Sequence, residues 1–321
     1  MKICITGGGN VYALNFAAYL HSLGIDHFGI GRSPRKPSAF WVAHHYHYHV
    51  AHIVRELPAV MAILDTERPD VVVNFAAQGE GQASFDNRAP LFYDTNTSGL
   101  VRLATELAKR TYVLRFIQIG TSELYGSTAS PATEDSPLNP SSPYAVSKAA
   151  FDLHLGIMAR VQGFPANVIR PSNCVCVGQQ LHRIVPKAII CALSGRRLPL
   201  HGGGRAEKSY LHATDLSRAI LDVVHRGAPG LVYNCGPDKP TSIRDVVEMV
   251  AAQCGVAFDS FVEMAPDRTG QDSRYWLDSS RLKALGWRQR IALPEAVADM
   301  VRWVRSNPEI LEMSTDYTVR P

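Results

Sequence analysis

The chain has 321 residues, of which 46% are hydrophobic and 19% are charged, so it can bury one large core or two modest ones. Its formal net charge is only +4 and no polybasic block occurs, which argues against nucleic-acid and membrane-surface binding. Six scattered cysteines without a CxxC pair exclude a dense disulfide framework and favour a reducing cytoplasm.

Short apolar runs alternate with helical patterns up to about residue 170, an order typical of βαβ units around a parallel sheet. The first strand begins almost at once, so we expect no signal segment, and no apolar run is long enough to span a membrane. The strands lack polar alternation, as expected where helices cover both faces. In chain order, we predict strand 2–6, helix 11–23, strand 27–31, helix 54–67, strand 70–77, helix 97–110 and strand 113–120.

A longer helix is predicted over 143–162, because Ser142 can cap it, a proline fits its first turn and Gly163 can end it. After that helix and one further strand, the pattern loosens into short mixed segments. We therefore predict an α/β fold with a Rossmann-type, doubly wound parallel sheet over 1–170. A smaller α/β substrate domain is expected over 171–321, with some of its segments returning to the first domain.

The histidine-rich segment HHYHYHVAH, residues 44–52, raises the question of a metal site. Alternation along a strand places His45, His47 and His49 on one face. Adjacent same-face positions on one strand lie too far apart to share one ion easily, so we expect no metal here. The segment is then an aromatic-rich strand with partly exposed histidines.

Glycines follow the first strand in the stretch TGGGNVYA, residues 6–13. A dinucleotide-binding loop uses its first glycine for the turn, its second for close approach to the pyrophosphate and its third for helix packing. Gly7 fills the first role and Ala13 is small enough for the third, whereas Asn10 stands at the second position. We predict a modified cofactor loop in which Asn10 contacts or slightly shifts the phosphates.

Two later motifs carry side chains suited to proton transfer. In SSPYAVSK, Tyr144 and Lys148 lie four apart and share one face of the predicted helix, although a surface pair has the same spacing. An ammonium and a nicotinamide cation lower the pKa of a nearby tyrosine, which makes Tyr144 a candidate base. In TSELYG, Thr121 can bind a substrate hydroxyl and Glu123 can act as acid or base, although a capped turn that includes Ser122 explains the same residues.

The motifs occur in one order along nearly the whole chain: TGGG, NFAA, TSELYG, SSPYAVSK, RPSN, GGGRAEKSYLHATDL, VYNCG and DRTGQDSRYWLD. In this order they resemble the extended short-chain dehydrogenase/reductase superfamily, in particular its nucleotide-sugar branch. Within that branch the sequence is most similar to the NDP-hexose 4,6-dehydratases of the dTDP-glucose and GDP-mannose types. The resemblance implies a dehydration of a nucleotide sugar that regenerates its NAD(P) cofactor in each cycle.

The resemblance also implies catalytic roles. Tyr144 would take the proton of the sugar's fourth hydroxyl while hydride passes to the oxidised cofactor, and Lys148 would hold the ribose and lower the tyrosine pKa. Thr121 would orient that hydroxyl, and Glu123 would remove the proton of the fifth carbon. Water then leaves from the sixth carbon and hydride returns there. Ser122 stands where the dTDP-glucose enzymes carry an aspartate, so the acid for the departing water is Glu123 itself or an unassigned neighbour.

Binding residues follow from the same resemblance. We expect cofactor contacts from Gly7, Asn10, Val11, Arg32, Ala76, Tyr144 and Lys148. We expect contacts to the nucleotide sugar from Ser84, Asn173, Lys208, Asn234 and Arg268. Lys208 replaces a family arginine and keeps its charge without the bidentate geometry. For Lys208 and Arg268, a solvated surface charge is the alternative interpretation.

The cofactor preference depends on the end of the second predicted strand. An acidic residue there binds the ribose hydroxyls of NAD, whereas GIGRSPRK offers Arg32, Ser33 and further basic residues. A guanidinium suits a 2′-phosphate, so we expect NAD or NADP and favour NADP, although an ordinary basic loop fits the same residues. The resemblance further implies a homodimer built from the helices near 97–110 and 143–162.

Two alternatives stay open. A 4-epimerase or a decarboxylase of the same fold is one, but an epimerase needs no base at the fifth carbon, which Glu123 would supply. Gly178-Gln179 also lacks an immediate basic partner for a uronate carboxylate. The other is a non-catalytic protein that binds NAD(P) or a nucleotide sugar, and such a protein has no use for the proposed catalytic residues.

Overall fold

The computed structural model describes residues 1–79, 84–267 and 272–316. Its centre is a seven-stranded sheet in the order β11-β6-β5-β4-β1-β2-β3, in which every neighbouring pair is parallel. This order confirms the predicted Rossmann-type sheet, extended by one strand. The strands are β1 (Lys2–Thr6), β2 (Asp26–Gly31), β3 (His47–Val50), β4 (Val71–Asn74), β5 (Arg115–Ile119), β6 (Ala166–Pro171) and β11 (Val232–Cys235).

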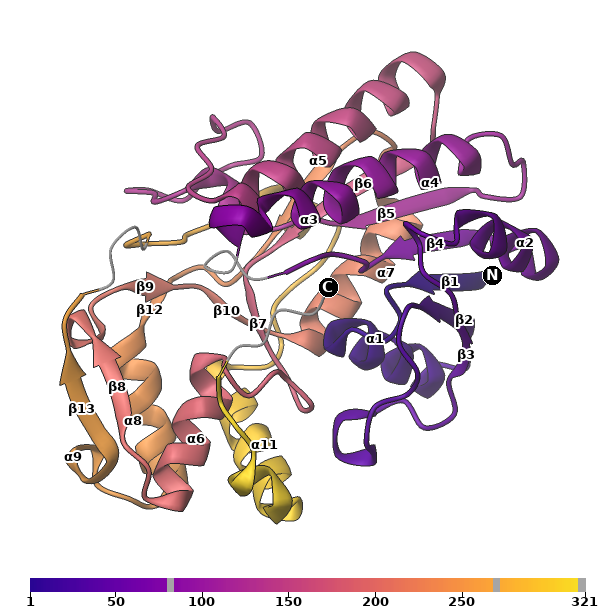
Figure 1. Ribbon diagram of the computed structural model, residues 1–321. Coiled ribbons are helices and arrows are strands. Elements are labelled where there is room, and N and C mark those ends of the chain that lie inside the picture. The colour runs from indigo at the N-terminus through magenta and orange to yellow at the C-terminus, as the bar shows by residue number, and fades with distance from the viewer. Residues whose placement is uncertain (80–83, 268–271, 317–321) are drawn as a thin grey trace.

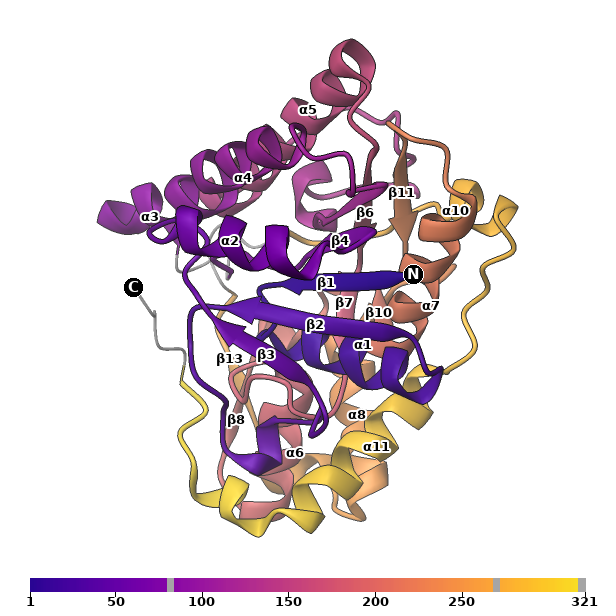
Figure 2. The same cartoon turned by 90° about the vertical axis from the view of Figure 1, so that its right-hand side faces the viewer.

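Helices cover both faces of the sheet (Figures 1 and 2). Apolar residues of α1 (Val11–Ser22) and α7 (Ala213–Arg226) pack against one face. Those of α2 (Leu57–Glu67), α4 (Leu100–Leu107) and α5 (Pro143–Gln162) pack against the other. Because the sheet is covered twice, its central strands are buried along almost their whole length, which explains their continuous apolar runs.

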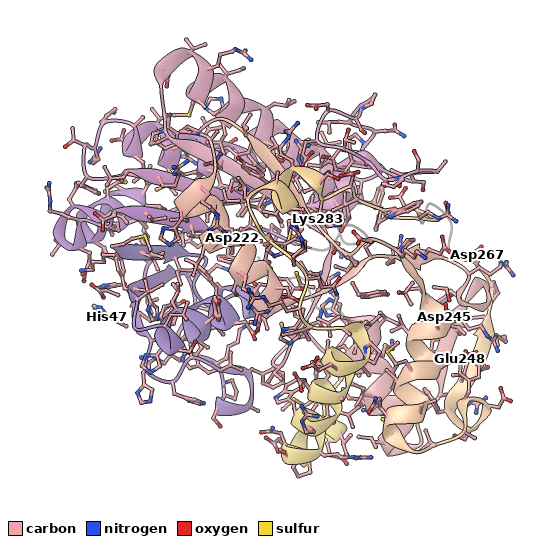
Figure 3. The ribbon with its side chains drawn as sticks, turned by 180° about the vertical axis from the view of Figure 1, so that it is seen from behind. His47, Asp222, Asp245, Glu248, Asp267 and Lys283 are labelled. Carbon is pink, nitrogen blue, oxygen red and sulfur yellow. The ribbon has the colours of Figure 1, made fainter. Side chains whose placement is uncertain are left out.

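A smaller lobe follows β6 in the chain and packs around a core of its own. Its helices α6, α8 and α11 pack against one another and share this core with the β8–β13 pair, and charged side chains of α8 such as Asp245 and Glu248 are exposed on its surface (Figure 3). The elements after β6 outside the central sheet and α7 are β7 (Asn173–Val175), α6 (Ile184–Ser194), β8 (Leu198–His201), β9 (Glu207–Lys208), β10 (Tyr210–His212), β12 (Thr241–Ser242), α8 (Ile243–Cys254), α9 (Phe258–Phe261), β13 (Val262–Ala265), α10 (Ser280–Ala284) and α11 (Leu293–Ser306).

The long helix α5 confirms its prediction at both ends. Ser142 Oγ accepts a 3.2 Å hydrogen bond from the backbone N–H of Ala145, and Gly163 takes the left-handed conformation that ends the helix. The prediction over 97–110 is only partly right. The structure has a helix α3 (Ala89–Tyr93), a π-helical segment Asp94–Gly99 and then α4.

The π-helical segment carries a polar side chain that forms hydrogen bonds with the loop after β4 and with α5. The Asn96 amide bonds to both backbone groups of Gln78 and donates to Ser147 Oγ, at 2.8 to 3.0 Å. A π turn inside a helix is uncommon and often marks a functional region. Here it connects the loop after β4 with α5. Shorter 3-10 turns span Ser38–Phe40, Asp86–Arg88, Ser122–Tyr125, Gly202–Gly204 and Pro308–Glu312.

The histidine-rich segment differs from its prediction. His45 precedes β3 and stacks on His21, with ring centroids 5.2 Å apart, so it does not share the face of the other two histidines. His47 and His49 lie on β3 with ring centroids only 4.5 Å apart. The expected wide separation of these two side chains is therefore wrong, because their rings lean toward each other. Within the described part of the chain, no helix is long and apolar enough to cross a membrane.

Candidate active site

The carboxyl ends of five central strands open onto one cavity of about 980 Å³. Open α/β sheets place their ligands at this edge, where the strand order reverses between β1 and β4. Most of the residues predicted for the site line this cavity: Gly7, Asn10, Arg32, Ala76, Thr121, Glu123, Tyr144, Lys148, Asn173 and Lys208. The fold thus brings the predicted catalytic residues and the glycine loop to one place.

Some predicted site residues lie outside this lining. Val11 is buried against Cys176 and Ala213, and Ser122 is buried at the start of a 3-10 turn. Ser84 is buried as well, and its Oγ accepts a 3.0 Å hydrogen bond from the backbone N–H of Tyr144. Ser84 therefore positions the first turn of α5. Arg268 lies outside the described residues.

Asn234 is also held away from the cavity lining. Its Oδ1 accepts a 2.9 Å hydrogen bond from Tyr125 Oη, and its Nδ2 donates to the backbone oxygen of Ala132 at 2.8 Å. Tyr125 Oη in turn accepts from Arg170, which forms a buried ion pair with Asp152. The Asn234 amide thus belongs to a buried polar network behind the site.

The glycine loop fits closely against the loop after β4. Gly7 has a positive φ of 67°, and a β-carbon there would overlap the backbone of Ala76. Asn10 is the N-cap of α1, because its Oδ1 accepts a 2.9 Å hydrogen bond from the backbone N–H of Tyr12. An asparagine at this position therefore has a local structural reason. The first turn of α1 meets the cavity at Asn10, as a site for phosphate requires.

A chain of buried polar side chains joins the ends of three central strands. Thr6 Oγ1 donates to Asn74 Oδ1 at 2.6 Å, and Asn74 Nδ2 donates to Gln118 Oε1 at 2.7 Å. These residues end or nearly end β1, β4 and β5, immediately before the loops that carry Gly7, Ala76 and Thr121. The sequence analysis missed this network. The sequence feature that could have revealed the network is a polar residue near the end of each otherwise apolar strand.

The side chain of Tyr48, a residue of β3, fills the space at the end of β2, where an acidic side chain often binds the cofactor ribose. Gly31 stands there, and a β-carbon on it would overlap the Tyr48 hydroxyl, which donates to the backbone oxygen of Ser33 at 2.8 Å. Tyr48 also lies over Gly9 and lines the cavity. The sequence analysis did not assign Tyr48, because only the pairing of β3 with β2 brings it here.

Basic side chains gather beside Tyr48. Arg32 and Lys36 line this part of the cavity together with His52. Burial lowers the pKa of His52, and the positive charges of Arg32 and Arg55 lower it further. The lowered pKa leaves His52 largely neutral at pH 7, so it is Arg32 and Lys36 that make this end of the cavity suited to a group with negative charge.

Lys148 is buried beneath Tyr144, one turn further along α5. Its Nζ donates a 2.7 Å hydrogen bond to the backbone oxygen of Ile119, at the end of β5. Burial lowers the pKa of Lys148 to about 8, and the nearby carboxylate of Asp152 opposes the shift. The Tyr144 ring meets the edge of Phe92, with centroids 6.2 Å apart.

Thr121 and Glu123 begin the turn after β5. Thr121 Oγ1 accepts a 3.2 Å hydrogen bond from the backbone N–H of Glu123, so the capped turn considered from the sequence is present. Both residues nevertheless line the cavity together with Tyr144. The cap orders the segment and leaves the Glu123 side chain on the cavity wall.

The opposite wall carries a buried lysine. Lys208 Nζ donates to the backbone oxygen of Asp272 at 2.7 Å and lies 3.6 Å from the centroid of the Tyr275 ring. Burial lowers the pKa of Lys208 to about 8, against the influence of the Asp272 and Glu123 carboxylates. The alternative of a solvated surface charge is wrong for Lys208, because its side chain is buried.

Tyr275 and Asp272 complete this wall, and the sequence analysis did not assign either of them. Tyr275 Oη donates to Asp272 Oδ2 at 2.7 Å, and both residues line the cavity. Burial raises the pKa of Tyr275, and the charge of Glu123 raises it further. Tyr275 therefore stays a hydrogen-bond donor. The sequence feature that could have revealed Tyr275 is its position in the last motif, three residues after Asp272.

Comparisons with known proteins place this site in context. The sequence model described as "NAD dependent epimerase/dehydratase family" matches residues 3–236. The dTDP-glucose 4,6-dehydratase of Streptomyces niveus is 33% identical over 240 residues, which are 74% of this chain and 70% of that protein. The crystal structure of DesIV, a dTDP-glucose 4,6-dehydratase from Streptomyces venezuelae with NAD and TYD bound, has a TM-score of 0.88 at 27% identity. The match covers 96% of this chain and 98% of the DesIV chain.

A longer relative matches with similar identity. The trifunctional UDP-glucose 4,6-dehydratase/UDP-4-keto-6-deoxy-D-glucose 3,5-epimerase/UDP-4-keto-L-rhamnose-reductase RHM3 of Arabidopsis thaliana is 33% identical over 251 residues. The match spans 77% of this chain but only 38% of that protein. The chain thus corresponds to less than half the length of this relative.

Proposed function

Because the chain belongs to the NAD dependent epimerase/dehydratase family, we propose that it is a nucleotide-sugar 4,6-dehydratase. The observation that carries this proposal is the placement of Glu123 in one cavity with Thr121, Tyr144 and Lys148. A 4-epimerase needs no base at the fifth carbon of the sugar, whereas a dehydratase does. The names of similar proteins, among them dTDP-glucose 4,6-dehydratases, support the same reaction.

The residues at the strand ends fit a nicotinamide dinucleotide. The Gly7 turn and the start of α1 at Asn10 would hold its pyrophosphate, and the small side chain of Ala76 leaves room beside them. Tyr48 and Arg32 would face its adenosine end. When bound, the dinucleotide supplies the oxidising and reducing power of the cycle.

Tyr144 and its neighbours act on the fourth hydroxyl of the sugar. Thr121 forms a hydrogen bond with this hydroxyl. Tyr144 removes the proton of the hydroxyl as the fourth carbon is oxidised. Lys148, one helical turn away, supplies the positive charge that stabilises the phenolate. Its hydrogen bond to Ile119 fixes the ammonium beneath the tyrosine.

Glu123 acts on the fifth carbon, whose proton becomes acidic beside the new ketone. Its carboxylate takes this proton, and the C6–O bond breaks as the C5–C6 double bond forms. Glu123 then passes this proton to the departing hydroxide, so that one water leaves. Hydride returns to the sixth carbon, and the fifth carbon takes a proton that comes from solvent. Ser122 is buried outside the cavity lining, so we assign it no part in this step.

Lys208 and Asn173 would hold the diphosphate of the substrate. Both residues line the cavity between the sheet and the smaller lobe, and β7, which carries Asn173, pairs with β10 of that lobe. Lys208 offers a compact positive charge, and its burial strengthens its interaction with a phosphate. Part of this charge is already balanced by Asp272 and Glu123.

For the cofactor we propose that NADP is bound at least as well as NAD. Gly31 leaves no acidic side chain at the end of β2, and Arg32, Lys36 and His52 surround the same end of the cavity. A 2′-phosphate would meet the positive charges of Arg32 and Lys36, whereas the ribose hydroxyls of NAD would meet no carboxylate among the described residues that line this end of the cavity. Titration of both cofactors against the protein tests this preference.

We further propose that the protein is a cytoplasmic homodimer. All six cysteines are buried and unpaired, which suits a reducing compartment. Val146, Leu153, Ile157 and Val161 form an exposed apolar stripe along α5, with relative exposures between 38% and 70%. A second copy of this helix would bury the stripe, because the residues repeat at intervals of four and seven.

A substrate panel tests the proposed reaction. The protein is incubated with NAD or NADP and with UDP-, GDP-, CDP- and dTDP-hexoses, and the sugars are analysed by mass spectrometry. Loss of one water from one of these sugars supports the dehydratase. Inversion at the fourth carbon without water loss would establish an epimerase instead. Cofactor binding without any sugar turnover would contradict the proposal.

A further inference from the structure

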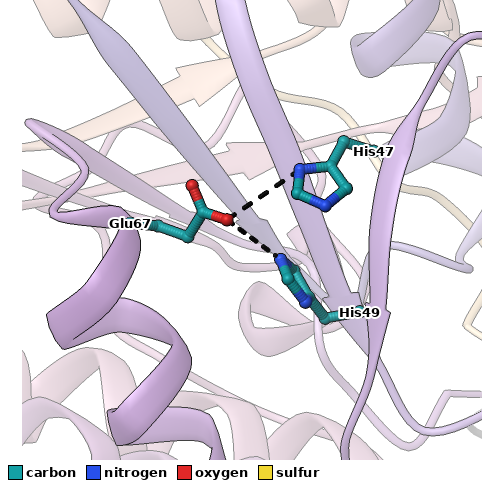
Figure 4. Close-up of side chains that lie close together, drawn as sticks. All are labelled: His47, His49 and Glu67. Atoms are coloured by element: carbon teal, nitrogen blue, oxygen red, sulfur yellow. Dashed lines mark hydrogen bonds and ion pairs between the residues drawn. The ribbon is translucent and has the colours of Figure 1, made fainter.

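We propose that His47, His49 and Glu67 form a binding site for one divalent metal ion of the zinc type, apart from the active-site cavity. The two histidines belong to β3, the edge strand of the central sheet, and Glu67 is the last residue of α2. Figure 4 shows the three side chains pointing toward one another. None of them lines the cavity.

The local fold explains why these side chains meet. Residues two apart on a strand share one face, so His47 and His49 both lean toward the layer that holds α2. The helix ends where the left-handed Arg68 turns the chain, which leaves the Glu67 carboxylate above the edge strand. The site therefore joins two elements that are otherwise separate in the chain.

The ligand atoms are close enough for one ion. One atom from each residue lies within 4.8 Å of the others, and Glu67 Oε1 is 3.3 Å from His49 Nε2 and 3.9 Å from His47 Nδ1. Neighbouring ligands of a tetrahedral zinc ion are about 3.3 Å apart, given metal–ligand bonds of about 2.0 Å. Only His47 has to move closer, and it is the most exposed of the three side chains.

The charges around the site leave one carboxylate oxygen for a metal. Lys2 Nζ pairs with Glu67 Oε2 at 2.5 Å, while Oε1 faces the histidines. The lysine also lowers the pKa of Glu67, so the carboxylate is ionised at neutral pH. Phe28 supports the cluster from below, with its ring edge-on to His49 at 5.8 Å. The nearby ammonium weakens the attraction for a cation and sets a limit on the affinity.

The chemistry of the donors selects the class of ion. Two imidazoles and one carboxylate suit Zn²⁺, Co²⁺, Ni²⁺ and Cu²⁺, whereas Mg²⁺ and Ca²⁺ prefer oxygen ligands only. Three protein ligands at a partly exposed place leave further positions to water. Such an ion would link β3, at the edge of the sheet, to α2. We therefore expect it to stabilise the folded protein.

Isothermal titration with ZnCl₂, after treatment with a chelator, tests the site. The wild type should bind one ion, and His47→Ala and Glu67→Gln should each bind it at least about tenfold more weakly. His44→Ala is the matched control, because His44 is exposed in the same segment but lies outside the cluster. Equal zinc affinity in the wild type and in His47→Ala would overturn the proposal.

Thermal unfolding and the cobalt spectrum give independent readouts. Zn²⁺ should raise the Tm of the wild type and of His44→Ala, but not that of His47→Ala, whose Tm without metal should equal that of the wild type. Co²⁺ should give visible d–d absorption only where the three ligands are intact. Loss of the absorption in His44→Ala but not in His47→Ala would contradict the site. Neither readout depends on the proposed sugar chemistry.

Discussion

Lys148 Nζ donates a 2.7 Å hydrogen bond to the backbone oxygen of Ile119, so the long helix α5 is tied to the end of β5 inside the protein. The lysine reaches this position from one turn below Tyr144, and Thr121 follows Ile119 by two residues. One buried contact therefore ties the helix that carries Tyr144 to the strand that leads to Thr121. Burial of the ammonium lowers the pKa of Lys148 to about 8.

The lowered pKa of Lys148 predicts a pH-dependent stability. In the unfolded chain this lysine titrates near its ordinary value of 10.5, so between pH 8 and 10.5 the unfolded state binds more protons than the folded state. The contribution of Lys148 to the free energy of unfolding must then rise with pH across this window. Relative to Lys148→Met, the wild type should gain about 2 kcal/mol of unfolding free energy between pH 7.5 and 9.5 in urea titrations. A difference between the two proteins that does not change with pH would contradict this interpretation.

The buried chain of Thr6, Asn74 and Gln118 predicts a large effect of one substitution. Asn74→Leu leaves the Thr6 hydroxyl and Gln118 Oε1 without their partner, and each unsatisfied buried group costs about 1–3 kcal/mol. We expect a loss of about 2 kcal/mol or more in urea unfolding. The exposed Asn87→Leu is the control and should change stability by less than about 0.5 kcal/mol. Equal effects of the two substitutions would refute the role of the network.

Arg32 predicts the preference between the two cofactors. Its guanidinium would meet the 2′-phosphate, and a hydrogen bond to a charged group contributes about 1.5–3 kcal/mol. Arg32→Ala should therefore weaken NADP binding about tenfold or more, with little effect on NAD, in fluorescence titrations. Arg35→Ala is the matched control, because Arg35 donates to the backbone oxygen of Tyr46 and lies over the Trp41 ring. An equal loss for both cofactors would argue against a phosphate contact.

The apolar stripe of α5 predicts the oligomeric state. Ile157→Glu places a charge in the middle of the proposed interface, so the protein should change from dimer to monomer in size-exclusion chromatography with light scattering. Ala62→Glu, on an exposed position of α2, should leave the mass unchanged. A wild type that is already monomeric would contradict the proposed homodimer.

Local signals explain which elements could be predicted. Both ends of α5 follow from Ser142 and Gly163, because a cap and a left-handed glycine act within one turn of the chain. The sheet follows from the alternation of buried strands and helices. The helix over 97–110 could not be placed correctly, since the π-helical segment depends on contacts of Asn96 with Gln78 and Ser147.

The remaining differences arise from contacts between distant residues. Tyr48 reaches the end of the cavity beside Arg32 only because β3 pairs with β2. Asn234 carries a polar side chain typical of a binding site, but the buried network of Tyr125 and Arg170 uses it. His47 and His49 converge because Glu67 lies above them at the end of another element. The spacing of residues along one strand does not show which distant residue lies beside them.

The most direct test of the proposed dehydratase is the reaction in deuterated water, followed by NMR of the product. Glu123 is proposed to pass the proton of the fifth carbon to the departing water, so this carbon is reprotonated from solvent and the wild type should form a 4-keto-6-deoxy sugar that carries deuterium there. Glu123→Gln should lose this activity by about 10²–10⁴-fold and keep its cofactor affinity. A variant that dehydrated the sugar at the wild-type rate, or a product without deuterium at the fifth carbon, would contradict the account.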